Sequence, residues 1–143
     1  MSLLVLDASV AAKWYLPRVD EPLAEEALAL LRQYSAGNVE FVVPDLFWAE
    51  FANILWKCVR TDRVSPKSAS DALTGILEYG FRTVGTTELA EAALAIALST
   101  GRTVYDAIYV ALAVQRNAAF VTADERLVNS LATHWPVTWL GVL

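Results

Sequence analysis

Short apolar runs of strand length alternate with longer helical patterns along the whole chain, and this alternation limits its possible folds more than any other feature. Parallel strands need a long crossover between them, which is usually a helix. The alternation therefore predicts an α/β protein whose parallel sheet is covered by helices on both faces. The expected strands are Leu3–Leu6, Glu40–Val43, Phe81–Val84, Ala119–Thr122 and a final edge strand, Val137–Leu140.

Helical periodicity fills the intervals between these runs, and proline and glycine punctuate it. Pro17 closes the first helix, Pro22 is expected in the first turn of the second, and Gly80 and Gly101 end two later ones. The expected helices are Ser9–Leu16, Glu21–Tyr34, Asp45–Arg60, Ser65–Tyr79, Thr86–Leu98, Val104–Arg116 and Asp124–Leu131.

The composition indicates one folded domain over residues 1–143, with 56% hydrophobic and 19% charged residues. The longest uncharged stretch, Ala92–Gly101, is too short to span a bilayer, and the N-terminus lacks the basic region of a signal peptide. A single cysteine, Cys58, allows no internal disulfide, so we expect a cytoplasmic protein. The excess of apolar residues favours a dimer interface or a partner groove.

Four acidic residues lie in apolar stretches, where an unpaired charge is costly to bury. Asp7 ends the run LLVLD, Glu50 lies within DLFWAEFANILW, Asp106 opens YDAIYVALAVQ, and Asp124 follows AAFVTAD. If the fold gathers them, a divalent metal ion is the natural counter-charge, and carboxylate-held metals perform phosphodiester chemistry. The net charge of -5 does not exclude a nucleic-acid substrate, because 11 basic residues would face only 12 acids without these four.

Three of these acids have structural explanations that are at least equally good when each is taken singly. Asp7 could cap the first helix, and Asp106 lies in a first helical turn, where negative charge is favoured. Asp124 lies in a segment that fits a capping box with Thr122 as the cap and Glu125 as its partner.

Glu50 has no such explanation, because it lies well inside a helix among apolar neighbours. Asn53 follows it by three residues on the same helical face and can hydrogen-bond a carboxylate or a metal-bound water. The metal-site hypothesis therefore requires this helix to direct Glu50 and Asn53 at Asp7 and Asp106.

Oxygen ligands without histidine or cysteine favour Mg²⁺ or Mn²⁺ over Zn²⁺. The one histidine, His134, is expected on the surface or in packing. Ser9 and Thr122 are expected to add hydroxyl groups to the site or to cap helices. Lys13 is expected to be solvated, although it lies where it could reach a phosphate.

Four segments together resemble the PIN-domain ribonucleases, and particularly the VapC toxins of bacterial toxin–antitoxin pairs. They are LLVLDASVAAKWYLP, VPDLFWAEFANILWK, YDAIYVALA and FVTADERL, which span almost the whole chain in the expected order. The resemblance implies a three-layer α/β/α sandwich with a mostly parallel five-stranded sheet.

It also implies an endoribonuclease that depends on Mg²⁺ or Mn²⁺. Asp7 and Asp106 would be central metal ligands, Glu50 and Asp124 would complete the set, and Thr122 would support it. The expected partners are an RNA substrate, a cognate VapB-like antitoxin and a second copy of the chain. Trp14, Trp48 and Trp56 could line the antitoxin groove, whereas Trp135 and Trp139 are expected in the core or a dimer contact.

Three alternatives remain. A phosphoryl-accepting receiver domain fits poorly, because it needs paired acids after the first strand and a lysine after the fifth, and no lysine follows Lys67. A PIN-like module could bind RNA or a protein without cleaving. Finally, the acids could be helix caps that never converge.

Overall fold

Five parallel strands form a single sheet in the computed structural model, which describes residues 1–143. All four neighbouring pairs are parallel, and the strand order β3-β2-β1-β4-β5 places β1 at the centre. The expected α/β fold and the edge position of the last strand are confirmed. The strands are β1 (Ser2–Leu6), β2 (Val39–Pro44), β3 (Arg82–Val84), β4 (Ala119–Thr122) and β5 (Val137–Trp139).

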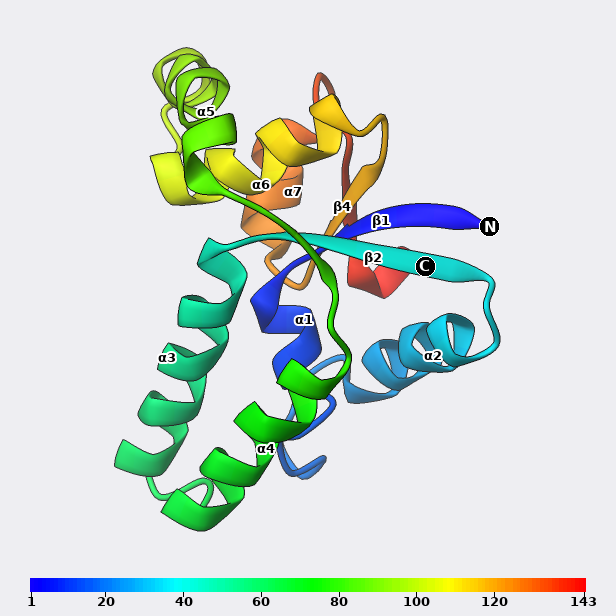
Figure 1. Ribbon diagram of the computed structural model, residues 1–143, viewed down its shortest axis with the longest axis vertical. Helices are drawn as coiled ribbons and strands as arrows, with labels where there is room; N and C mark the ends of the chain where they lie inside the picture. The colour runs from blue at the N-terminus through cyan, green and yellow to red at the C-terminus, as the bar shows by residue number, and fades with distance from the viewer.

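Seven α-helices cover the two faces of this sheet and complete the three-layer sandwich (Figure 1). They are α1 (Ala8–Ala12), α2 (Ala24–Ser35), α3 (Leu46–Arg60), α4 (Pro66–Glu78), α5 (Thr86–Thr100), α6 (Val104–Gln115) and α7 (Glu125–Leu131). Helices α1 to α4 bury their apolar residues on one face, and α5 to α7 do so on the other. None of the helices has both the length and the apolar character needed to cross a membrane.

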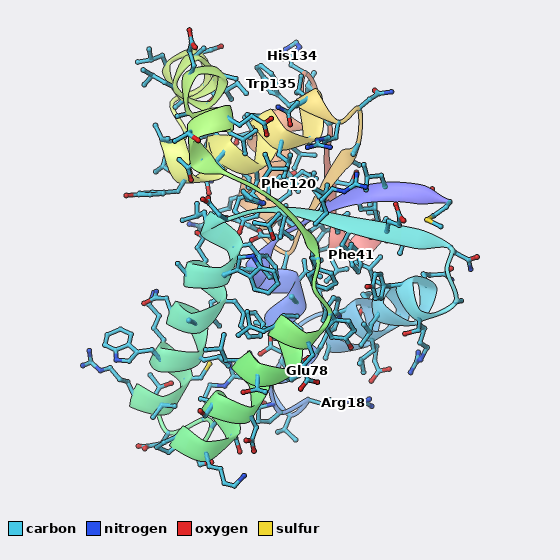
Figure 2. The ribbon with its side chains drawn as sticks, in the orientation of Figure 1. Arg18, Phe41, Glu78, Phe120, His134 and Trp135 are labelled. Carbon is cyan, nitrogen blue, oxygen red and sulfur yellow. The ribbon has the colours of Figure 1, made fainter.

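Alternation along the strands explains how one sheet supports two cores. Successive side chains of a strand point to opposite faces, so Val5 packs with α5–α7 and Leu6 packs with α1–α4. Both residues are fully buried, as befits the central strand. Figure 2 labels Phe41 of the first core, on the side of α2 and α4, and Phe120 of the second core, beside α6.

The segment between α1 and α2 departs from the expected boundaries. The first helix ends at Ala12, and the second begins at Ala24 because Leu23 adopts a left-handed conformation (φ 59°). Pro22 therefore precedes the helix instead of lying in its first turn. Lys13 is buried, not solvated, and its Nζ donates to the Pro22 carbonyl and to Glu21 Oε2, both at 2.6 Å. This contact fixes the segment together with backbone turn bonds, such as that from the Leu16 N–H to the Ala12 carbonyl (3.1 Å).

Candidate active site

Asp7 lies at the carboxyl end of the central strand and has two functions in the local structure. Its Oδ1 accepts the Ser9 backbone N–H (3.3 Å) as the N-cap of α1, and its Oδ2 accepts the Thr122 hydroxyl (2.6 Å). Burial raises the pKa of Asp7 above its ordinary value of 3.8, and the charge of Asp106 adds to this, while hydrogen bonds from Thr122 and Ser9 oppose it. One residue thus combines a helix cap with an acid whose pKa is raised.

Glu50 lies in the second turn of α3, and its side chain meets a phenol from α6. The Tyr109 Oη donates to Glu50 Oε1 at 2.5 Å. Burial raises the pKa of Glu50 above 4.5, the Tyr109 bond opposes this, and the charges of Asp7 and Asp106 raise it further. Burial and the nearby carboxylates also raise the pKa of Tyr109 far above its ordinary value, so its hydroxyl remains a donor.

A cavity of about 590 Å³ opens between β1, α1 and α3 and brings several expected residues together. Glu50 and Asn53 line it together with Asp7, as the metal-site hypothesis requires for Asp7, whereas Asp106 and Asp124 are not among its lining residues. The Ser9 hydroxyl is buried at this cavity and has no hydrogen-bond partner. The polar residues of its lining are Asp7, Ser9, Glu50, Asn53, Lys57 and Tyr105.

Asp106 and Asp124 face an arginine, Arg102, that no sequence motif indicated as part of the site. Arg102 Nη2 lies 3.4 Å from Asp106 Oδ2 and 4.0 Å from Asp124 Oδ2, and its side chain is only 28% exposed. Asp124 Oδ1 accepts the backbone N–H groups of Arg126 and Leu127 (3.1 and 3.2 Å). Arg102 lies just before the N-cap of α6 and Asp106 in the first turn of that helix, so their four-residue spacing was the available signal in the sequence.

The expected capping box around Thr122 is wrong, because Asp124 itself caps α7. Thr122 is the last residue of β4 and is completely buried. Its Oγ1 donates to Asp7 and accepts the backbone N–H of Asp124 (3.1 Å). One hydroxyl thus joins two of the four acids.

The donor chemistry fits a hard divalent cation, although the carboxylates are not closed around one point. No group of three or more Asp, Glu, His or Cys side chains is arranged to hold a metal ion. Like charges that lack a counter-ion repel one another, and Arg102 draws Asp106 and Asp124 towards itself. Oxygen donors and the unpartnered Ser9 hydroxyl nevertheless suit Mg²⁺ or Mn²⁺. His134 lies exposed in the loop after α7, as expected, and provides no ligand here (Figure 2).

The fold and the site together define a class of protein. It is an all-parallel α/β sandwich with a carboxylate-lined cavity at the carboxyl ends of its strands. The PIN domain family model matches residues 4–130. Ribonuclease VapC3 of Pyrobaculum aerophilum is 35% identical over 126 residues, which cover 87% of this chain and 91% of that protein. The chain therefore belongs to the PIN-domain family.

Solved structures show the same fold at lower identity. The crystal structure of PAE2754 from Pyrobaculum aerophilum matches with a TM-score of 0.71 and 23% identity, over 99% of this chain and 85% of that one. A chain of a toxin–antitoxin complex from Klebsiella pneumoniae matches with a TM-score of 0.62 and 15% identity, over 94% and 95% of the two chains.

Proposed function

We propose that the protein is a Mg²⁺- or Mn²⁺-dependent endoribonuclease and the toxin of a VapBC-type toxin–antitoxin pair. The observation that carries this proposal is the shared cavity, in which Asp7 and Glu50 face each other beside the unpartnered Ser9 hydroxyl. The 35% identity to a ribonuclease over most of both chains supports it.

Each acid would have a distinct part in holding the ion. Asp7, Glu50 and Asp106 would bind it. Besides burial, the charge of Asp106 raises the pKa of Asp7, and the charges of Asp7 and Asp106 raise the pKa of Glu50. Asp124 would contribute the oxygen not used in capping α7. Thr122 would keep the Asp7 carboxylate in place. A divalent ion bound there supplies an activated water and positive charge next to the scissile phosphodiester.

Two polar residues of α3 are suited to contact the RNA backbone or bases next to the carboxylates. Asn53 and Lys57 are exposed, line the same cavity and follow Glu50 at successive turns of the helix. Lys57 would pair with a phosphate, and Asn53 would hydrogen-bond a base, a ribose or a metal-bound water. The substrate that these two side chains would contact is RNA, which we propose is met in the cytoplasm.

The proposal includes a VapB-like antitoxin and a second copy of the chain as partners. A similar chain in Klebsiella pneumoniae occurs in a toxin–antitoxin complex, which supports the first of these. Of the three tryptophans expected in the groove, only Trp56 is largely exposed (53%). Trp14 belongs to the core, where its Nε1 donates to the Ala27 carbonyl, and Trp48 is half-buried.

RNA cleavage by purified protein tests the proposal. We expect Mg²⁺-dependent cleavage by the wild type and at least a hundredfold loss in Asp7→Asn and Asp106→Asn, since each removes a proposed ligand. Asp71→Asn is the matched control, because Asp71 lies exposed on α4 and pairs only with Lys67. Equal activity in all four proteins would contradict the assigned site, and RNA binding without cleavage would favour the non-catalytic PIN-like module.

A further inference from the structure

The hydroxyl of Tyr109 is aimed at the proposed metal site from within the protein core. The residue is only 3% exposed, and its ring stacks on Phe120 of β4 with centroids 4.9 Å apart and planes inclined by 14°. Tyr109 lies one turn after Asp106 on α6, so this helix brings a carboxylate and a hydrogen-bond donor to the same side. The stacked ring leaves the hydroxyl little freedom to move.

Glu50 needs such a donor, because nothing else in the fold holds its carboxylate. The Tyr109 bond is its one side-chain hydrogen bond, and no lysine or arginine forms an ion pair with it. Asp7 and Asp106 act on it with charge of the same sign, so the free side chain would turn away from them towards water.

We propose that Tyr109 is a positioning residue that holds Glu50 towards Asp7, so that both carboxylates can bind one divalent cation. This inference rests on the proposed metal site and adds a residue that acts only through Glu50. A neutral phenol suits the task better than a lysine or arginine, because it fixes the carboxylate without neutralising it. The full negative charge then remains available to the cation.

A double-mutant cycle on Mn²⁺ affinity, measured by isothermal titration without RNA, tests the inference. Loss of a group that orients a metal ligand typically weakens binding about 10–100-fold, so we expect at least tenfold weaker binding in Tyr109→Phe. In a Glu50→Gln background the same substitution should change the affinity less than about twofold, because its target is already altered. Tyr34→Phe is the control, since Tyr34 is also stacked on a phenylalanine but makes no side-chain hydrogen bond.

Two outcomes of the cycle would overturn the inference. One is an unchanged Mn²⁺ affinity in Tyr109→Phe. The other is a double variant in which the two single-variant losses of Mn²⁺ affinity multiply, as they would for independent residues. Proton NMR provides a second test that does not depend on the folding of Tyr109→Phe. The wild type should show a slowly exchanging, downfield Tyr109 hydroxyl proton close to the Glu50 side chain, and this signal should shift in Glu50→Gln. An absent or unshifted signal would equally overturn it.

The proposed function and this inference fail separately. A wild type that binds Mn²⁺ with the expected coupling but cleaves no RNA would refute the ribonuclease and leave the role of Tyr109 standing. A wild type that cleaves RNA without coupling between Tyr109 and Glu50 would do the opposite. A wild type that binds no Mn²⁺ would overturn the role of Tyr109 together with the metal site.

Discussion

Replacing Thr122 with valine should reveal how much the fold depends on one buried hydroxyl at the site. Valine keeps the shape of threonine but loses both hydrogen bonds of Oγ1, the one donated to Asp7 and the one accepted from the Asp124 N–H. Thr122 is 0% exposed, so water cannot replace either bond. The substitution therefore removes a charge-assisted bond and leaves a backbone donor unpaired.

The expected cost is about 1.5–3 kcal/mol at pH 7.5 without metal. A hydrogen bond to a charged acceptor contributes about 1.5–3 kcal/mol, and an unpaired, part-buried N–H costs about 1 kcal/mol more. Burying a methyl group in place of the hydroxyl offsets about 1 kcal/mol. Because this range is well above the scatter of surface substitutions, about 0.5 kcal/mol, equilibrium unfolding can resolve it.

The deficit should also depend on pH with a defined sign. The folded-state pKa of Asp7 is raised by burial above 3.8, and the Thr122 bond restrains that rise. In wild type and variant alike, the contribution of Asp7 is complete below pH 3.8 and is lost as the pH rises through the folded pKa. The stability lost on raising the pH is larger in Thr122→Val, because its Asp7 pKa is higher still. The difference in unfolding free energy between wild type and variant should therefore shrink to about 1 kcal/mol in acid.

Urea unfolding in a chelator, followed by tryptophan fluorescence at pH 7.5 and in acid, measures both effects. Thr138→Val is the matched control, since Thr138 lies on the neighbouring strand β5 with no side-chain hydrogen bond and should change stability little. A Thr122→Val deficit below about 0.5 kcal/mol at pH 7.5, or one that is independent of pH, would refute this account of the Asp7 environment.

Three further substitutions probe the charges around the site and in the core. Glu50→Gln should stabilise the metal-free protein by up to about 1 kcal/mol at pH 7.5, because burial and neighbouring carboxylates raise the folded-state pKa of Glu50. This gain should vanish below pH 4.5, the ordinary pKa of the Glu50 carboxyl, and thermal unfolding at two pH values checks both expectations. Glu21→Ala should cost about 3 kcal/mol in urea unfolding, since it leaves Lys13 buried without its ion-pair partner. Arg102→Met should tighten Mn²⁺ binding about two- to fivefold, because it frees Asp106 from a competing cation worth up to about 1 kcal/mol; unchanged affinity would show that this ion pair does not compete.

Patterns of short range were sufficient to predict the fold and much of the candidate site. Alternating strand and helix periods determine the sheet, and the carboxyl ends of parallel strands lie at one edge, which places Asp7 and Asp124 there. A helical period of 3.6 residues puts Glu50 and Asn53 on one face. These conclusions need only the geometry of single elements and one rule about how such elements connect.

The sequence alone could not predict contacts that depend on how distant elements pack. Tyr109 and Glu50 are 59 positions apart, and their hydrogen bond depends on how α3 and α6 meet across the sheet. Thr122 illustrates a different limit, because the segment Thr-Ala-Asp-Glu can start a helix at either of two caps. Only the length of β4 decides that Asp124 is the cap and that Thr122 faces Asp7.

The four acids are not equivalent without metal, and this difference indicates where a cation would gain most. Asp106 and Asp124 already face Arg102, and Asp124 is further satisfied by backbone N–H groups of α7. Asp7 and Glu50 have neutral donors alone, so their mutual repulsion remains unrelieved in the fold. A divalent ion would therefore bind most favourably between these two. Because such an ion binds the native state far better than the unfolded chain, its binding must also raise the free energy of unfolding.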